Sequence, residues 1–160
     1  MPTGCCSWDR KISNGRRRFK VLHDFNDEAV LDRETGLIWE LQPSNQTFQW
    51  SNARLRCAQL AVGGRGGWRL PAFNELASLV DPTVTDPAVP RLPAGHPFLD
   101  VEGAYWTATV FVEQGDFALT VGFSYVAGSD APITVNDANI AGATYHVWAV
   151  RGGSPGLHSY

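Results

Sequence analysis

The sequence predicts an α+β domain in which two helices pack on short twisted antiparallel sheets, with long loops between the elements. Three observations point to this class. The 160 residues include 16 glycines and 10 prolines, which favour many turns and short strands over long helices. Apolar residues recur with helical spacing in 50–62. Much of the last third instead alternates its side chains between two faces, as strands do.

The composition is that of one folded domain. Hydrophobic residues make up 44% of the chain and charged residues 18%, a balance typical of globular proteins rather than of disordered ones. The length is in the usual range for a single domain with a buried core. We expect a basic flexible arm over 1–18, one domain over 19–153 and a flexible tail over 154–160.

Short apolar stretches predict the first strands. Residues 19–22 and 29–32 are such stretches, and 33–36 has the composition of a turn before a further apolar stretch at 37–40. A hairpin closed by Gly36 is the simplest account of this pattern.

The spacing over 50–62 predicts a helix. Ser51 is a plausible N-cap, and two consecutive glycines after Val62 are expected to end the helix. The stripe that would face the core contains Trp50, Ala53, Cys57, Leu60 and Ala61.

A second helix is predicted from Pro71, which suits the first helical position, up to Asp81. Its expected inward side chains are Phe73, Leu76, Leu79 and Val80. Residues 82–98 contain five prolines, which predicts a long connecting loop.

The C-terminal third is predicted to be β. Strands are expected over 104–112 and 117–125, followed by a loop over 127–144 with at most a short strand in it. A further strand over 145–151 is expected to close the domain.

Charge is distributed unevenly along the chain. The net charge is −3, but residues 1–20 hold six basic side chains against Asp9, which gives +5 there and −8 for the rest. An acidic folded body repels nucleic acid, anionic membranes and sulfated glycans, so we expect no nucleic-acid partner. The basic tract 16–20 is interpreted as a solvated flank before the first strand, with a polyanion contact as the alternative.

No segment has the length of a membrane-spanning helix, and we expect no membrane insertion. The N-terminus also lacks the apolar region of a secretory signal. These features favour a cytoplasmic or particle-associated protein over a secreted one.

The chain has three cysteines, Cys5, Cys6 and Cys57. Adjacent cysteines would close a strained ring, so Cys5 and Cys6 are not expected to pair with each other. The spacing fits no zinc site, and free thiols in a reducing compartment are the favoured interpretation. A bridge from Cys57 to Cys5 or Cys6 stays open as the alternative.

Several blocks of sequence together carry a family pattern. They are 29–40, 50–53 with Cys57, 63–71 with 75–81, 105–109 and 147–153. The Gly-Gly-Trp-Arg-Leu-Pro run of 66–71 and the closing Val-Arg-Gly-Gly of 150–153 are the most specific parts. In this order the blocks resemble the bacterial Lcl C-terminal domain family, formerly a domain of unknown function, which includes a domain of a collagen-like adhesin.

The resemblance implies a C-type-lectin-like fold, of the variety shared with formylglycine-generating enzymes, and a role in adhesion or ligand binding. The adhesin domain is associated with glycosaminoglycan binding and with trimers, so an oligomer is one implied state. The family's glycines and tryptophans are implied to be scaffold. Many members carry a cysteine in the closing strand that is implied to pair with the helix cysteine. Here that position is Ala149, so the bridge is implied to be absent.

No residue set predicts catalysis. The four histidines are scattered along the chain, and neither a nucleophile elbow nor an HExxH motif is present. Relatives with oxidase activity use a late copper-binding cysteine pair, and this chain has no cysteine after Cys57. The calcium and sugar motifs of true lectins are also missing. We expect a non-enzymatic domain without metal or cofactor.

Residues 115–147 have a restricted alphabet. The stretch contains no Glu, Lys, Gln, Arg, Met or Trp and is rich in small residues with scattered aromatics. Such a composition suits an adaptable protein-binding surface, as in antibody paratopes. We predict a recognition face for a protein or cell-surface ligand on the last strands and the 127–146 loop. Its candidate residues are Tyr105, Phe123, Tyr125, Asn136, Asn139, Tyr145 and His146.

The same alphabet suggests a sharper hypothesis. The stretch contains no Trp, Met, Glu, Lys or Gln, the residue types that no codon ending in a pyrimidine encodes. Adenine-specific mutagenesis of asparagine codons yields a set of residues restricted in the same way. Retroelement-diversified ligand-binding proteins have the fold that the resemblance implies. Two alternatives remain: a glycan- or glycosaminoglycan-binding adhesin domain, which the basic arm favours, and a structural domain with no ligand of its own.

Overall fold

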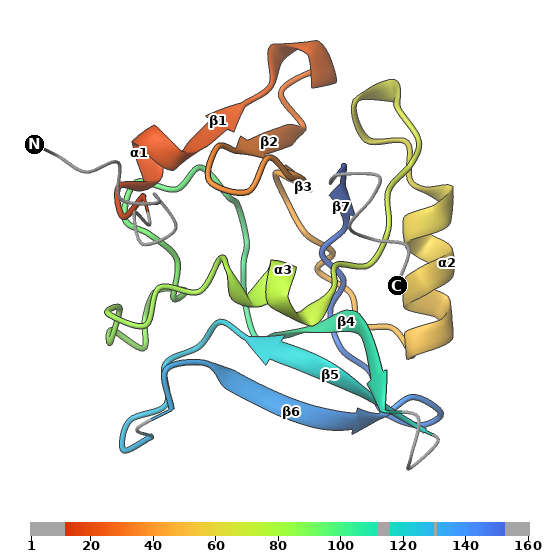
Figure 1. Ribbon diagram of the computed structural model, residues 1–160. Coiled ribbons are helices and arrows are strands. Elements are labelled where there is room, and N and C mark those ends of the chain that lie inside the picture. The colour runs from red at the N-terminus through yellow and green to blue at the C-terminus, as the bar shows by residue number, and fades with distance from the viewer. Residues whose placement is uncertain (1–11, 112–115, 130, 153–160) are drawn as a thin grey trace, which may run out of the picture.

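The computed structural model describes residues 12–111, 116–129 and 131–152, in which α-helices and two antiparallel sheets form a mixed α+β domain, as predicted (Figure 1). In chain order the elements are α1 (Gly15–Arg18), β1 (Phe19–Val21), the 3-10 helix η2 (His23–Phe25), β2 (Ala29–Asp32), β3 (Ile38–Glu40), α2 (Trp50–Gln59), the 3-10 helix η3 (Val62–Gly64), α3 (Phe73–Ala77), β4 (Ala104–Phe111), β5 (Phe117–Gly122), β6 (Thr134–Asn139) and β7 (Val150–Arg151).

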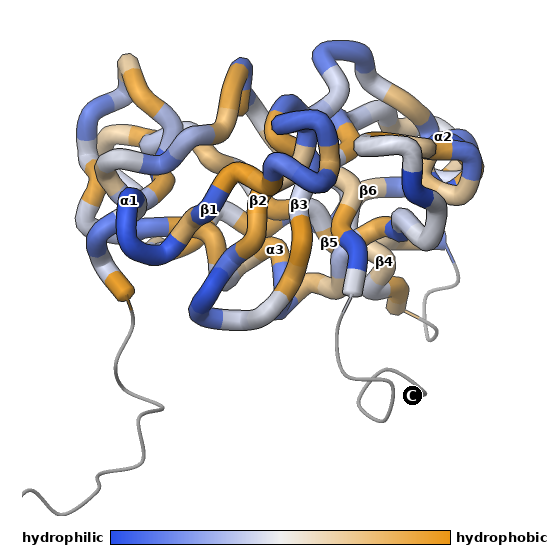
Figure 2. Tube along the Cα trace, turned by 90° about the horizontal axis from the view of Figure 1, so that it is seen from above, coloured by the Kyte–Doolittle hydropathy of each residue, from blue (hydrophilic) through white to orange (hydrophobic). Residues whose placement is uncertain are grey.

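The N-terminal sheet has the strand order β1-β2-β3-β7 and is antiparallel throughout. The predicted hairpin is confirmed as β2 and β3, with Val30 opposite Trp39. Gly36 closes its turn by donating its N–H to the carbonyl of Asp32 at 2.8 Å. The φ of +77° at Gly36 is one that a side chain would strain. In Figure 2, hydrophobic residues run along β2 and β3, while α1 outside them is hydrophilic.

The fold begins before Phe19, which corrects the predicted extent of the arm. Asn14 caps α1 by accepting the N–H of Arg16 at 2.9 Å, and Arg18 is fully buried. Gly15 packs so closely that an added Cβ would lie 2.6 Å from the backbone nitrogen of His96. Residues 12–18 are therefore part of the domain, and the rest of the predicted arm, Gly153 and the predicted tail 154–160 lie outside the described residues.

The helix predicted over 50–62 is present but shorter. Ala53 and Cys57 are buried, as the apolar stripe predicted. The cap prediction was wrong, because Ser51 lies inside the helix and Gln49 is the N-cap, without a side-chain cap bond. The helix ends at Gln59, since Leu60 is extended and a 3-10 turn follows.

The second predicted helix is also shorter, because α3 covers only Phe73–Ala77. Pro71 precedes it, and the Glu75 carboxylate accepts the N–H of the N-cap residue Ala72 at 2.8 Å. Leu76, Leu79 and Val80 are buried as predicted, although the last two lie beyond the helix. α3 lies between the two sheets (Figure 1).

The C-terminal sheet has the order β4-β5-β6 and contains the two predicted strands. Its third strand, β6, lies in the stretch for which at most a short strand was predicted. Of the predicted closing strand 145–151, only Val150–Arg151 is a regular strand, and Tyr145 and His146 form single bridges. Both faces of the first half of β4 are covered, because the consecutive residues Tyr105, Trp106 and Thr107 are all buried, whereas Val110 and Phe111 at its end are exposed.

The core is strongly aromatic. Trp148 packs against Trp39 with ring centroids 5.6 Å apart and against Phe98 at 4.8 Å, and all three side chains are buried. The indole N–H of Trp148 donates to the carbonyl of Glu40 at 2.9 Å, which satisfies its polar edge. This cluster joins the two sheets and holds the C-terminal segment in place.

Candidate functional site

Two of the seven candidate residues belong to the core. Tyr105 and Phe123 are both 0% exposed, and their rings lie 5.5 and 5.4 Å from that of Trp148. Burial raises the pKa of Tyr105 to about 12, and its hydroxyl accepts the N–H of Glu102 at 2.9 Å. These side chains cannot contact a ligand at the surface, so the prediction for them is corrected.

Tyr125 lies apart from the remaining candidates. The guanidinium of Arg91 is 5.7 Å from the centroid of its ring. Arg91 in turn donates to the carbonyls of Pro82 and Val84, in the proline-rich loop. Tyr125 follows the end of β5 at Gly122, whereas Asn139 pairs with the opposite end of that strand at Phe117. One small ligand would not reach both.

Asn136 and Asn139 are exposed on β6, the outer strand of its sheet. The Asn139 side-chain oxygen accepts the N–H of Ala141 at 2.8 Å, which starts the turn after the strand. That turn is tied to the start of α2, because the Gln49 amide donates to the carbonyl of Ala141 at 3.1 Å. The end of β6 therefore lies beside the N-terminus of α2.

Tyr145 and His146 are half-buried in an extended segment that runs beside β4. The Tyr145 ring meets that of the buried Trp106 edge-on, with centroids 5.0 Å apart. Its backbone exchanges two hydrogen bonds with Phe48, at 2.8 and 3.1 Å. The Nδ1 atom of His146 lies 3.0 Å from the carbonyl of Ser44. The segment thereby places Tyr145 next to the residues that lead into α2.

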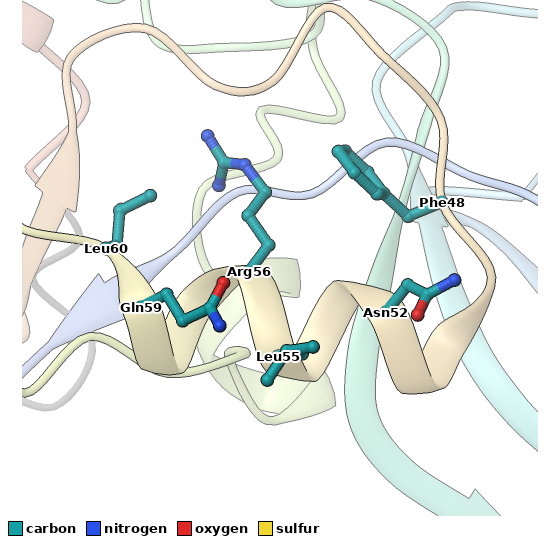
Figure 3. Close-up of a pocket in the computed structure, with 6 residues that line it drawn as sticks. All are labelled: Phe48, Asn52, Leu55, Arg56, Gln59 and Leu60. Carbon is teal, nitrogen blue, oxygen red and sulfur yellow. The ribbon is translucent and has the colours of Figure 1, made fainter.

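A groove runs along α2 on this side of the molecule (Figure 3). Its volume of about 520 Å³ is within the range of ligand sites in proteins. Leu55 on its flank is 53% exposed, which is high for a large apolar side chain. The lining residues are Phe48, Asn52, Leu55, Arg56, Gln59 and Leu60.

An ion pair lies beside the groove. Arg56 donates to both oxygens of the Glu40 carboxylate, at 3.0 and 3.2 Å, and Glu40 is 3% exposed. Glu40 also accepts the backbone N–H of Ala149 at 2.7 Å. Burial raises the pKa of Glu40, while the bonds from Arg56 and Ala149 oppose that rise. The pair fixes Arg56, so this part of the groove is preorganised and polar beside its apolar flank.

We call the groove together with Tyr145 and Asn139 the α2 surface. Two contacts connect these residues to the groove: the β-bridge between Phe48 and Tyr145, and the hydrogen bond from the Gln49 side chain to the carbonyl of Ala141. The groove was not predicted from the sequence. A signal was present, because Leu55 is a large apolar residue on the polar side of the predicted helix, away from the stripe of Ala53 and Cys57.

Within the described ranges 12–111, 116–129 and 131–152, no three His, Cys, Asp or Glu side chains are grouped so that they could hold a metal ion. Cys57 is a free, buried thiol whose pKa burial raises to about 12. In the same described part of the chain, no helix is both long enough and apolar enough to cross a membrane.

Comparison with known families agrees with the resemblance seen in the sequence blocks. A model of the Lcl C-terminal domain matches residues 28–151, which include both sheets except β1. Neither the comparison with curated proteins nor that with solved structures gave a match. The match spans most of the chain and indicates at most an adhesin-like or recognition domain. The chain belongs to the Lcl C-terminal domain family.

Proposed function

We propose that this chain is a non-catalytic recognition domain that binds a protein or cell-surface ligand through the α2 surface. The observation that carries the proposal is the open groove of about 520 Å³ with the exposed Leu55 on its flank. Exposed apolar surface beside fixed polar groups is typical of binding sites. Family membership supports the class of function, and we infer a C-type-lectin-like architecture from the same resemblance.

The arrangement favours binding over chemistry. Arg56 and Glu40 satisfy each other in a bidentate pair, and Cys57 is buried and protonated at neutral pH. Catalytic groups need to be accessible, whereas Glu40 and Cys57 are both buried. The α2 surface offers an apolar contact at Leu55, amides at Asn52 and Gln59, and the half-exposed ring of Tyr145 beside the groove. Such a mixture of apolar and polar groups is suited to binding the surface of another protein.

The test is an array of glycans and bacterial surface proteins probed with the purified domain, followed by affinity measurements on each ligand found. We expect Leu55→Asp to weaken binding at least tenfold, because a carboxylate would replace an apolar contact. Leu99→Asp is the matched control, since Leu99 is 49% exposed and does not line the groove. Equal affinities of the two variants for the ligand would mean that the ligand does not bind at the α2 surface. An array without any ligand would favour the structural alternative.

A second candidate is that the surface is diversified by a retroelement. The restricted alphabet of 115–147 favours it, and Asn139 and Tyr145 from that stretch belong to the α2 surface. We expect a near-copy of the coding segment close to a reverse-transcriptase gene, differing from it at adenines. Sequencing the surrounding DNA checks this, and a locus without such a copy would contradict it.

A further inference from the structure

Two arginines that are distant in the sequence meet at one aromatic ring. The guanidinium carbon of Arg65 lies 4.2 Å from the centroid of the Phe25 ring, and that of Arg151 lies 5.6 Å from the same centroid. A guanidinium group packs favourably against an aromatic ring and can still donate its N–H groups elsewhere. The ring therefore holds two positive charges close together.

The residues around this pair are firmly held. Phe25 is 3% exposed and packs edge-on against the buried Trp68, with ring centroids 6.4 Å apart. The Trp68 indole donates to the backbone carbonyl of Arg65 at 2.7 Å. The Nε of Arg151 donates to the carbonyl of Gly66 at 2.8 Å, which orients its side chain. Both guanidinium groups are thus positioned by the turn that follows α2 and by β7.

Neither charge is neutralised within the described part of the chain. The arginines that do pair with carboxylates there are Arg18, Arg56 and Arg69. The two terminal nitrogens of Arg151 have no hydrogen-bond partner among the described residues. The side chain of Arg65 is exposed and donates no hydrogen bond to any described residue. Two guanidinium groups at one ring, both without a carboxylate partner among the described residues, would attract an anion.

We propose that Arg65 and Arg151 form an anion site that binds a carboxylate group of a protein ligand. Guanidinium groups present a planar fork of donors that matches the two oxygens of a carboxylate. This site is separate from the α2 surface, because neither arginine lines the groove. It therefore does not depend on the function proposed above.

The surroundings favour a single carboxylate over a polyanion. The turn that contains Phe25 also carries Asp24, Asp27 and Glu28, which are all exposed. Glu28 accepts the N–H of Gly63 at 2.9 Å, next to the turn of Arg65. Closely spaced sulfates would meet these carboxylates and be repelled. A single carboxylate flanked by neutral or basic residues carries less negative charge and meets less of this repulsion.

The experiment follows the side-chain Nε–H signals of arginine by NMR in the full chain. The probe is the peptide acetyl-Ala-Glu-Lys-Ala-amide, and its Gln counterpart removes only the charge. We expect saturable shifts for Arg65 and Arg151 with the Glu peptide and none with the Gln peptide. Arg65→Gln should weaken binding about tenfold, as expected for losing a charge-assisted contact. Arg65→Lys should give an intermediate affinity, because it keeps the charge without the fork.

Arg54→Gln is the matched control. Arg54 lies over the Trp50 ring, with its guanidinium carbon 4.9 Å from the centroid, but no second arginine shares that ring. Its replacement should leave the affinity unchanged. Absence of a saturable shift, equal shifts with the Gln peptide, or equal losses for Arg54→Gln and Arg65→Gln would each overturn the proposal. A heparin-derived sulfated disaccharide that binds more tightly than the Glu peptide would also overturn it, by assigning the site to sulfate.

Discussion

Replacement of Asp32 by alanine is expected to lower the free energy of unfolding by about 3–5 kcal/mol, the usual effect of breaking a buried ion pair. The side chains of Arg18 and Asp32 are both 0% exposed. Arg18 donates from Nε and Nη2 to the two carboxylate oxygens, at 2.9 and 2.8 Å. Without Asp32, the hydrogen-bond and ion-pair partners of the buried guanidinium among the described residues would be Glu34 and the carbonyl of Ser78.

Urea unfolding followed by tryptophan fluorescence measures this change. The double variant Arg18→Met with Asp32→Ala should be more stable than Asp32→Ala alone, because no charge is then left buried. Asp27→Asn is the matched control, since Asp27 pairs with an exposed His23 and its loss should change stability little, and Asn tolerates the φ of +60° at this position. A loss below about 1 kcal/mol for Asp32→Ala, or no recovery in the double variant, would contradict the expectation.

This ion pair also explains why the start of the domain was misplaced. Basic residues at 16–18 have the pattern of a solvated flank, and nothing local marks Arg18 as different from its neighbours. Arg18 can be buried because Asp32, which follows it by 14 positions, is opposite Phe19 in the β1–β2 pair and so comes within hydrogen-bond distance of the Arg18 guanidinium. A local sequence pattern cannot predict partners that only strand pairing brings together.

The spacing of apolar residues correctly predicted the buried side chains where only one face of an element is covered. Ala53 and Cys57 on α2 are buried as their spacing predicted, because α2 has one face toward the core. The same logic failed for Tyr105 and Phe123. Alternation separates two faces of a strand, but it does not say that both are covered. Here Tyr105 packs against the buried Trp148 on one face of β4, and the next residue, Trp106, packs against Tyr145 on the other.

The family resemblance implies a disulfide between positions 57 and 149 in many members, which is implied to be absent here because position 149 is an alanine. Ala149→Cys is expected to form a disulfide with Cys57 and to raise the free energy of unfolding by about 2–4 kcal/mol. Cys57 and Ala149 are 1% and 0% exposed and belong to the same hydrophobic cluster. Glu40 connects them further, because its carboxylate accepts the N–H of Ala149 and raises the pKa of Cys57 in addition to burial.

The order of events matters for this experiment. The pKa of Cys57 is raised to about 12 by burial, so almost no thiolate is present in the folded protein at neutral pH. Disulfide exchange needs the thiolate, and the bridge is therefore expected to form during refolding with oxidised glutathione rather than in the native state. Replacing Cys5 and Cys6 by serine in all variants removes competing pairings.

A bridged product should be lighter by two hydrogens and should lose its added stability on reduction. The long loop between positions 57 and 149 is the reason for a large gain, since the bridge restricts the unfolded chain most when the loop is long. The same chain with Cys57→Ser and Ala149→Cys is the control, because it can form no bridge between these positions. Failure to oxidise on refolding would mean that the two side chains do not face each other. A bridge without added stability would mean that strain at the buried Ala149 offsets the gain.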